Sequence, residues 1–437
     1  MSSSTAPLPD SSASTSTSTT TTTTTTLPLS ENRIWIDGCF DFFHHGHAGV
    51  ILQSRRLGTE LLVGLHSDPD IAANKGPTVM NLAERVAAVD ASRWSTQCIP
   101  HAPYVTSLEY IGRYGCMYVA HGDDITSDAD GQDCYRYVKE ARRMKIVPRT
   151  PGISTTDLVG RMLRGGTEHF VQSLPACLEG GEGVGEGNGK EMNRRIHEYA
   201  AAANGLDPWV NVYCYQDNLE PPFRHLVPGL GPRPGQRIVY VDGAFDLFSA
   251  GHIGFLRAVT THETSLAPQS QPQQQQQQDS PFYLILGLHP DHAVNAVKGG
   301  PYPIMNLFER ALCAIQARFV HAVVLAAPTR PTNAYFASLP PLQAAGKPLP
   351  DAVYHGAPRH PSSPASSLDE RYADAKAAGI FTEISPPPEF RDVDAAQIVS
   401  RILGRRAEYE ERERRKGGKS LAEGVLKSGE MGRGKSG

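Results

Sequence analysis

Two histidines stand three positions apart directly after a short apolar segment, as His44 and His47 in "HHGH". Gly46 between them would let the backbone approach a ligand, and a helix that begins here would offer free N–H groups and its positive dipole end to an anion. Two imidazoles at a helix entrance suit a phosphate. Histidines at i and i+3 can also bind zinc, but no carboxylate or cysteine stands at complementary spacing nearby. We therefore expect a phosphate site and no metal held by the protein.

A second polar cluster, "RTPGIST" at residues 149–155, follows much later in the chain. Gly152 permits a tight turn, and Ser154 and Thr155 come just before an apolar segment, where hydroxyls and free backbone N–H groups would meet at a helix start. Arg149 would supply a charge-stabilising donor. Helix capping by Ser154 is compatible with phosphate binding, so we expect both.

The elements that must position these clusters alternate along the chain. From Ile34 a predicted strand leads into the histidine loop and a helix, and further strands and helices follow in turn. The segments are a helix at 48–57, a strand at 60–66, a helix at 81–92, a strand at 115–122 and a helix at 130–144. This order predicts an α/β fold with a parallel sheet, and such sheets bind ligands outside the carboxyl ends of their strands.

The sequence then repeats itself, which predicts two copies of one domain. Residues 37, 40, 41, 46 and 47 recur at 242, 245, 246, 251 and 252, and "MNLAER" at 80–85 recurs as "MNLFER" at 305–310. We predict a first domain at 31–164 and a second at 235–404 with a Gln-rich insertion at 266–280. We expect the copies to pack as an intramolecular pseudo-dimer, with a homodimer of whole chains as a further assembly that the sequence permits.

The remaining segments have compositions unlike a folded core. Residues 1–30 are almost wholly Ser and Thr, residues 165–234 are rich in Gly, Glu and Pro, and residues 405–437 are highly charged. We predict a disordered N-terminal tail, a linker with a helix near 192–203, and a disordered C-terminal tail.

Composition also limits the partners. The net charge of −4 gives no electrostatic reason to expect nucleic acid. No apolar run approaches the roughly 20 residues that span a bilayer, and the N-terminus lacks a signal-peptide pattern. The seven cysteines are scattered without a CxxC pair, which indicates a reducing compartment. We expect a cytoplasmic protein with no integral membrane segment.

The second copy departs from the first at its chemical positions. Ser249 replaces His44, and alignment of the following helices puts residues 393–395 opposite 153–155, so that Asp394 stands where phosphate should bind and would repel it. We expect turnover in the first copy only. A vestigial nucleotide site in the second copy would comprise Ala244, Phe245, Gly251, His252, Lys298 and Gly356.

"HHGH" resembles the HxGH signature of the nucleotidyltransferase superfamily, and "RTPGIST" resembles the RTxGIST signature of its cytidylyltransferase branch. A tandem arrangement of two such domains resembles the ethanolamine-phosphate cytidylyltransferase family. The resemblance implies two tandem Rossmann-like nucleotidyltransferase domains with parallel sheets flanked by helices. It also implies transfer of the cytidylyl group of CTP to phosphoethanolamine, which gives CDP-ethanolamine and pyrophosphate for phosphatidylethanolamine synthesis.

The resemblance also implies roles for single residues, with Mg²⁺ as the counter-ion of CTP. Asp123 or Asp124 would meet the substrate ammonium, although a helix-starting acidic loop explains them equally well. Lys75 would reach a CTP phosphate, and its alternative is a solvated loop lysine. The implied catalytic residues are His44, His47, Lys75 and Arg149, and the implied CTP-binding residues are Cys39, Phe40, Gly46, Arg85, His121, Gly122, Ser154 and Thr155.

Two of these segments have structural explanations as well. Arg85 and Glu84 could form a surface pair, because most of the helix around them has a core stripe. Asp41 is better suited to brace the histidine loop through backbone hydrogen bonds than to do chemistry.

Three other functions remain as alternatives. A choline-phosphate cytidylyltransferase would carry a long amphipathic membrane helix, whereas residues 405–419 are charged all round. A non-catalytic CTP-binding regulator would not need the complete set of His44, His47 and residues 149–155. An adenylyltransferase shares the first motif but not the second.

Overall fold

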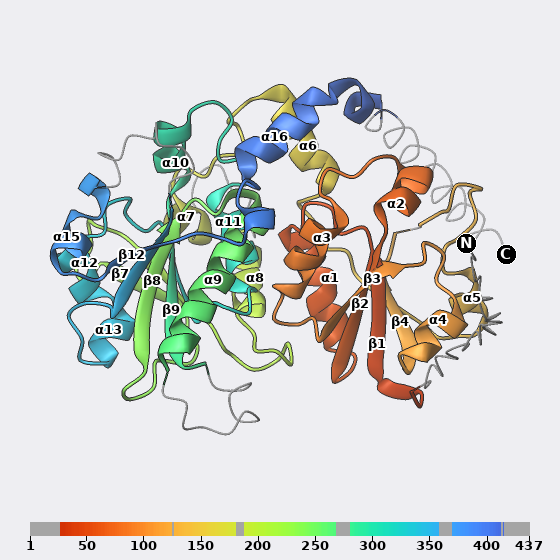
Figure 1. Cartoon of the computed structure of the whole chain (residues 1–437), viewed down its shortest axis with the longest axis horizontal. Coiled ribbons are helices and arrows are strands. Elements are labelled where there is room, and N and C mark those ends of the chain that lie inside the picture. The colour runs from red at the N-terminus through yellow and green to blue at the C-terminus, as the bar shows by residue number, and fades with distance from the viewer. Residues whose placement is uncertain are drawn as a thin grey trace, which may run out of the picture.

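The computed structural model describes residues 27–124, 126–180, 188–267, 280–357, 369–411 and 414. Residues 1–26 of the predicted N-terminal tail, residues 415–437 of the predicted C-terminal tail and residues 268–279 of the Gln-rich insertion lie outside the described residues. Two α/β halves stand side by side, each with a twisted sheet between layers of helices (Figure 1).

The first half has a five-stranded parallel sheet in the order β3-β2-β1-β4-β5. Ile34 and Ile36 of β1 face one layer of helices and Trp35 faces the other, so both sides of the sheet are buried. The strand order reverses direction between β1 and β4, where such folds bind ligands. The strands are β1 (Ser30–Gly38), β2 (Glu60–His66), β3 (Gln97–Ala102), β4 (Cys116–Gly122) and β5 (Met144–Val147). The helices are α1 (His45–Arg55), α2 (Asp68–Lys75), α3 (Leu82–Asp90), α4 (Leu108–Arg113), α5 (Arg136–Glu140) and α6 (Thr155–Arg164).

The second half repeats this order and extends it. Its sheet runs β12-β11-β8-β9-β10 and continues with β6 and β7. The predicted fold of two tandem α/β domains is therefore confirmed. Its strands are β6 (Asn211–Tyr215), β7 (Phe223–Val227), β8 (Arg237–Gly243), β9 (Phe282–Leu288), β10 (Ala322–Leu325), β11 (Ala352–Gly356) and β12 (Phe381–Ile384). Its helices include η1 (Asp246–Phe248), α9 (Ala250–Leu266), α10 (Asp291–Lys298), α11 (Leu307–Ile315), α12 (Asn333–Ser338), α13 (Pro340–Ala344), α15 (Ala373–Ala377), η2 (Pro388–Phe390) and α16 (Ala395–Gly404).

Part of the segment predicted as a linker is folded. Residues 165–234 contain α7 (Leu174–Leu178) and α8 (Asn188–Tyr199), and β6 pairs in parallel with β10 while β7 pairs antiparallel with β6. Val212 and Cys214 are buried in the core. The Gly- and Glu-rich residues upstream give the segment 165–234 the composition of a linker. The two short strands, which extend the second sheet, contribute too few residues to change that composition.

The predicted charged tail also begins too early. Residues 406–411 are helical, and Tyr409 is only 1% exposed. Its hydroxyl donates a hydrogen bond to the carbonyl of Thr78 in the first half, 3.3 Å away. One aromatic residue among charged neighbours thus fastens the end of the described chain to the first domain.

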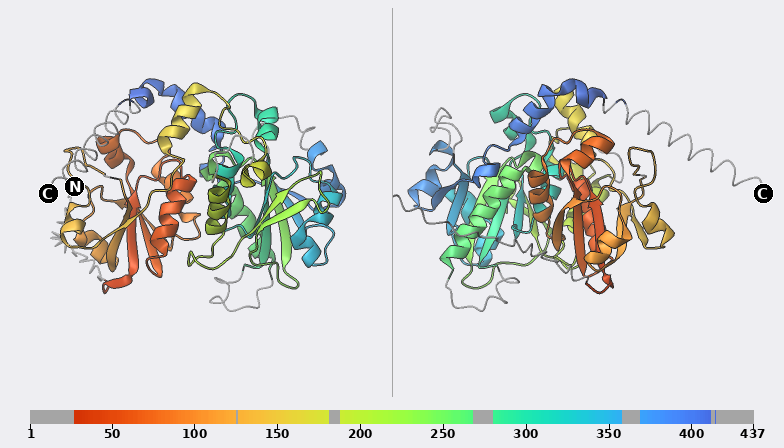
Figure 2. Two further views of the ribbon diagram at one scale, coloured as in Figure 1. Left: turned by 180° about the vertical axis from the view of Figure 1, so that it is seen from behind. Right: turned by 45° about the vertical axis from the view of Figure 1, so that its right-hand side comes forward.

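The two halves meet along a pseudo-symmetric seam. Arg93 of the first half donates to the carbonyls of Ile315, Ala317 and Val320 at 2.8–3.1 Å. The equivalent Arg318 donates to carbonyls of the first half. Helices α3 and α9 pack across this seam, and α6 and α16 lie side by side above it (Figures 1 and 2). A single apolar core runs through both halves. In the described part of the chain no helix is long and apolar enough to cross a membrane.

Replacement of Arg93 by Ala should lower the free energy of unfolding by about 3 kcal/mol or more, because it leaves several buried carbonyls without donors. Arg257 is the matched control, since its ion pair with Asp90 at the same seam is exposed, and Arg257→Ala should cost less than about 1 kcal/mol. Urea unfolding followed by circular dichroism measures both. Equal losses would contradict a structural seam built on Arg93.

Candidate active site

A cavity of about 250 Å³ opens at the carboxyl ends of β1 and β4 in the first half. It is lined by residues from both predicted motifs, so the fold brings together clusters that are far apart in the sequence. The predicted site residues that line it are Cys39, Phe40, His44, Gly46, His47, Lys75, His121, Gly122, Asp124, Arg149, Ser154 and Thr155.

His44 is the side-chain cap of α1. Its Nδ1 accepts a hydrogen bond from the backbone N–H of Gly46 at 3.1 Å, which leaves Nε2 as the protonated ring nitrogen of the neutral side chain. The ring stacks on that of His47 with 3.9 Å between centroids. An added Cβ at Gly46 would lie 2.9 Å from the His44 ring and 3.1 Å from Ile153. Glycine is needed here because any side chain would displace His44.

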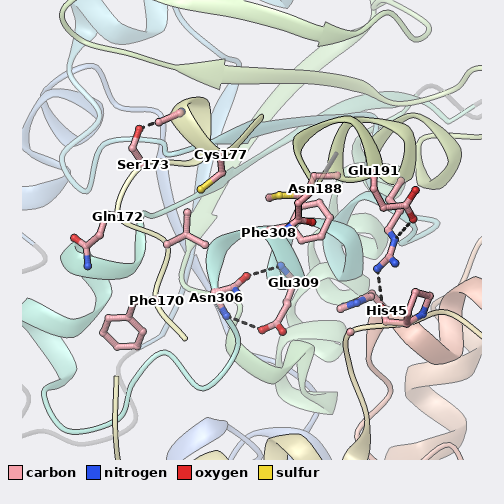
Figure 3. A pocket seen from close by; sticks show the side chains of 16 residues that line it. His45, Phe170, Gln172, Ser173, Cys177, Asn188, Glu191, Asn306, Phe308 and Glu309 are labelled. Carbon is pink, nitrogen blue, oxygen red and sulfur yellow. Dashed lines mark hydrogen bonds and ion pairs between the residues drawn. The ribbon is translucent and has the colours of Figure 1, made fainter. Parts of the chain in front are cut away.

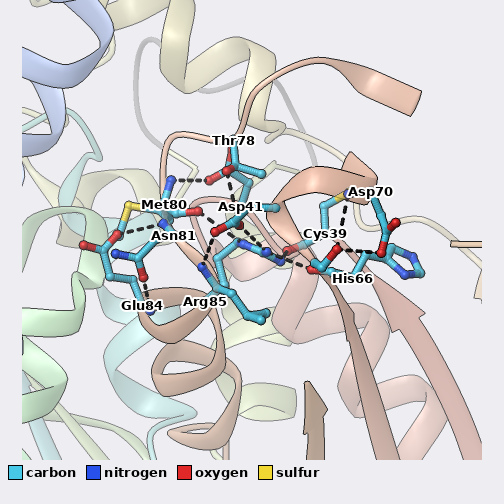
Figure 4. Close-up of polar contacts among 12 residues, drawn as sticks. Cys39, Asp41, His66, Asp70, Thr78, Met80, Asn81, Glu84 and Arg85 are labelled. Atoms are coloured by element: carbon cyan, nitrogen blue, oxygen red, sulfur yellow. Dashed lines mark hydrogen bonds and ion pairs between the residues drawn. The ribbon is translucent and has the colours of Figure 1, made fainter. Parts of the chain in front are cut away.

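The loop before His44 has a strained backbone. Phe40 and Phe42 have φ angles of 52° and 49°, in the left-handed region that large side chains disfavour. Between them the carboxylate of Asp41 accepts hydrogen bonds from the backbone N–H groups of Val79 and Met80, both at 3.0 Å (Figure 4). The predicted bracing role of Asp41 is thus confirmed.

Arg85 lies in the core and not in this cavity, contrary to its predicted contact with CTP phosphates. It is 1% exposed, and its guanidinium donates to the carbonyls of Met80, Cys39 and His66 and to the carboxylate of Asp68 (Figure 4). These four acceptors engage four of its five N–H groups, and the buried side chain does not line the cavity. Arg85 instead fixes the Cys39 end of the histidine loop.

Arg310 of the second half makes the same set of bonds. Its guanidinium donates to the carbonyls of Met305, Ala244 and His289 and to Asp291. An arrangement that persists where the histidine motif is incomplete is structural.

The second motif folds as a helix start. Ser154 accepts a hydrogen bond from the N–H of Asp157 at 3.1 Å and caps α6, as expected. The Thr155 hydroxyl donates to the carbonyl of Asp41 at 3.3 Å, which ties the two motifs together. Asp123, which does not line the cavity, accepts from the backbone N–H of Arg149 at 3.2 Å. Asp124 is therefore the carboxylate better placed to face a ligand.

Sequence reasoning missed Asp37, at the end of β1. Its carboxylate accepts from the indole of Trp35 at 2.8 Å and from the hydroxyls of Thr106 and Tyr135 at 2.6 Å each. Burial, followed by the charge of Asp37, raises the pKa of Tyr135 well above its usual value. The recurrence of this aspartate as Asp242 was the available signal. Thr126 and Thr150 also line the cavity without having been predicted.

The second half has different contacts at the corresponding positions. The Ser249 hydroxyl donates to the carbonyl of Val393 at 2.7 Å, and the N–H of Ser249 donates to Nδ1 of His252 at 3.2 Å. An added Cβ at Gly251 would lie 2.3 Å from that same carbonyl oxygen. Asp394 caps α16 as Ser154 caps α6, which confirms the alignment of the two motifs. The Val393 carbonyl oxygen therefore lies against Gly251, whereas its counterpart in the first half, Gly46, lines the cavity.

The other residues of the predicted vestigial site have these positions. The Ala244 carbonyl accepts from Arg310, and Phe245 has a φ angle of 47°. Lys298 lies over the Tyr302 ring, 5.8 Å from its centroid, and Gly356 ends β11.

A larger cavity of about 750 Å³ lies between the halves (Figure 3). His45, Pro151 and Gly152 line it from the first half, with Asn306, Phe308 and Glu309 from the second and residues of α7 and α8. His45 therefore lines this larger cavity, whereas His44 and His47 line the smaller one. No group of three or more His, Cys, Asp or Glu side chains suited to a metal ion occurs within the described ranges.

His45 should make stability depend on pH. Burial, followed by the charges of Arg195 and Arg161, lowers its pKa to about 3. In the unfolded chain histidine titrates near 6.5, so the unfolded state binds more protons between about pH 6.5 and 3. The stabilisation is complete above this window and is lost as pH falls. Lowering the pH from 7 to 5 should reduce the free energy of unfolding of both the parent chain and His45→Gln. The reduction should be about 2 kcal/mol smaller in His45→Gln, which has no histidine to protonate at this position.

His262 is exposed and lies outside this cavity, and His262→Gln provides the same substitution at a second histidine for comparison. Urea unfolding at several pH values measures both variants. Parallel profiles for His45→Gln and the parent would refute this assignment.

Gly46→Ala should reduce binding of inorganic pyrophosphate at least tenfold, about 1.4 kcal/mol, because the added methyl group displaces His44. Gly112→Ala is the control, since an added Cβ there meets nothing within 4 Å. Isothermal titration calorimetry measures the affinity. Unchanged binding in Gly46→Ala would show that the His44 position is unimportant for the anion.

Comparison with known proteins agrees with this geometry. Residues 35–161 match the family described as Cytidylyltransferase-like. The chain is 35% identical over 412 residues to the ethanolamine-phosphate cytidylyltransferase of Mus musculus, with 89% of this chain and 90% of that protein covered. It is 34% identical over 396 residues to the protein of the same name from Dictyostelium discoideum, covering 89% of this chain and 95% of that one.

A second kind of relative matches far less of the chain. Choline-phosphate cytidylyltransferase A of Homo sapiens is 39% identical over 134 residues, which cover 30% of this chain and 36% of that protein. The two proteins named for ethanolamine phosphate extend through both halves. The chain belongs to the ethanolamine-phosphate cytidylyltransferase family.

Proposed function

We propose that the first half transfers the cytidylyl group of CTP to phosphoethanolamine, giving CDP-ethanolamine and pyrophosphate. The observation that carries this proposal is the meeting of the "HHGH" and "RTPGIST" segments around one cavity. Membership of the family supplies the substrates, through the names of relatives that match both halves.

The reaction needs alignment more than proton transfer. A phosphate oxygen of phosphoethanolamine attacks the α-phosphorus of CTP, a new P–O bond forms, and the bond to the β-phosphate oxygen breaks with its electron pair leaving on pyrophosphate. A phosphate monoester has a second pKa of about 6 and is already mostly dianionic near neutral pH. The nucleophile therefore needs no general base, and positioning and charge stabilisation carry the catalysis.

The cavity offers the donors that such a transition state requires. His44 directs its Nε2–H as a donor, because Nδ1 is occupied by Gly46. The starts of α1 and α6 both border the cavity and present their positive dipole ends to it. His47, Arg149 and Lys75 would stabilise the charge on the α-phosphate and on departing pyrophosphate.

Mg²⁺ would arrive with CTP. Both carboxylate oxygens of Asp41 and of Asp37 accept hydrogen bonds from protein donors, so these buried acids are poor candidates for a resident metal. Phosphate oxygens and water would then hold the ion, as is common for Mg²⁺. Bound there, it would neutralise phosphate charge.

The ends of β4 and of the following loop would select the two organic groups. Backbone groups at His121 and Gly122 would contact cytosine, and Asp124 would contact the ethanolamine ammonium. Asp123 is already engaged by the backbone of Arg149 and would act through that residue.

The second half would serve as a scaffold without turnover. Where the first half has the His44 ring, it has the Ser249 hydroxyl bonded to the carbonyl of Val393, and that carbonyl oxygen lies against Gly251. We infer that the halves work as an intramolecular pseudo-dimer in the cytoplasm, and that a homodimer of whole chains is a further assembly.

With CTP and Mg²⁺, the purified chain should release pyrophosphate far faster with phosphoethanolamine than with phosphocholine. His47→Ala should reduce the rate by about 10²-fold or more, because it removes a preorganised donor. His252→Ala in the second half is the matched control and should keep most of the activity.

Each alternative function has its own outcome in this assay. Preference for phosphocholine would favour the choline enzyme, preference for ATP an adenylyltransferase, and CTP binding without turnover a regulator. Equal loss from both histidine substitutions would refute the division of labour between the halves.

A further inference from the structure

We propose that Arg401, in the second half, is a positioning residue for the reaction of the first half; this inference rests on the proposed function. Arg401 lies on α16 and reaches across the seam to α3. Its two terminal nitrogens bind both oxygens of Glu84 at 2.6 Å, and one of them also donates to the carbonyl of Val79 at 3.0 Å. The Glu84 side chain is only 3% exposed.

The segment that Arg401 holds is the one that braces the histidine loop. Glu84 accepts from the N–H of Asn81 at 3.1 Å, and the Asn81 side chain accepts from the N–H of Glu84 at 3.0 Å. The preceding residues Val79 and Met80 donate to Asp41 (Figure 4). A continuous chain of hydrogen bonds therefore leads from Arg401 to the carboxylate three residues before His44.

Tyr409 supplies a second contact from beyond α16. Its hydroxyl donates to the carbonyl of Thr78, next to the carbonyl of Val79 that Arg401 holds. The second half thus binds two consecutive carbonyls of this segment, while Asp41 binds two consecutive N–H groups of it. The segment is fixed from both sides.

The pseudo-symmetric counterpart of this contact, made by Arg161, provides an internal control. Arg161 on α6 binds both oxygens of Glu309 at 2.6 and 2.8 Å and donates to the carbonyl of Ile304 at 3.0 Å. Asp246 accepts from the N–H groups of Ile304 and Met305 at 2.8 and 3.0 Å. The two ion pairs have matching geometry, but Arg161 braces the loop of the half in which Ser249 replaces the first histidine of the motif.

This symmetry separates positioning from general stability. A lysine keeps the charge of either arginine but cannot make the two-pronged bond to a carboxylate. Arg401→Lys and Arg161→Lys therefore each weaken one interdomain ion pair of the same kind. Only the first releases the loop that carries His44.

The test compares Arg401→Lys with Arg161→Lys in the full chain. With CTP, Mg²⁺ and phosphoethanolamine, Arg401→Lys should lower kcat about tenfold to a hundredfold, because small displacements of catalytic groups are costly. KM for CTP should change less than kcat. Arg161→Lys should keep kcat within about twofold, on the same physical ground that its loop takes no part in the reaction.

Amide hydrogen exchange gives a readout independent of turnover. Exchange at Val79 and Met80 should accelerate in Arg401→Lys, and exchange at Ile304 and Met305 in Arg161→Lys. Tyr409→Phe removes one hydroxyl and provides a milder variant should Arg401→Lys fail to fold; it should lower kcat in the same direction by a smaller factor.

Each outcome decides between the two proposals. Equal kcat values for the two lysine variants, or unchanged exchange at Val79 and Met80, would overturn the role of Arg401. If Arg401→Lys does not fold, an unchanged kcat in Tyr409→Phe would overturn it. Absence of turnover in the parent chain would instead refute the proposed function, and with it a positioning role in that reaction.

Discussion

The site depends on the hydrogen bonds that the Asp41 carboxylate accepts from the backbone N–H groups of Val79 and Met80. The histidine loop passes through unfavourable left-handed conformations at Phe40 and Phe42, and a loop of that kind persists only where its surroundings fix it. Asp41 fixes it with two backbone bonds. Around this point Arg85 holds the loop entrance and Thr155 joins the second motif, so His44 enters α1 with its ring already oriented.

The two halves show that this framework is separable from the chemistry it supports. The second half has equivalents of the buried aspartate and arginine, Asp246 and Arg310. It also has the reciprocal hydrogen bonds between an asparagine and a glutamate, Asn306 and Glu309, at the start of the equivalent helix. It differs at Ser249 and at Val393, whose carbonyl is turned against Gly251. A few atoms distinguish the two copies of the histidine motif, while the order of the five corresponding strands around them is the same.

Much of the fold and part of the site could be predicted because they follow from local patterns in the sequence. Alternating strands and helices predict the parallel sheet, the repeat predicts the second half, and the spacing of His44, Gly46 and His47 predicts a ligand-facing helix start. Arg85 was misassigned because a sequence gives the type of a side chain but not its direction, and an arginine beside a site can point into the core. Strands β6 and β7 were missed because a short apolar run was averaged with its Gly-rich neighbours, and Tyr409 because one aromatic anchor leaves no periodic signal.

The exchange of arginines between the halves creates a mutual dependence. Each half supplies one helix, α6 or α16, to brace the other half's loop, so neither loop is complete within its own domain. Separate inheritance of the domains would leave Glu84 and Glu309 buried without their arginine partners. A duplicated domain that joins its twin in this way is free to lose its own reactive residues, yet it cannot be discarded. The chain accordingly joins two halves of one framework, of which the first carries the full histidine motif and the second does not.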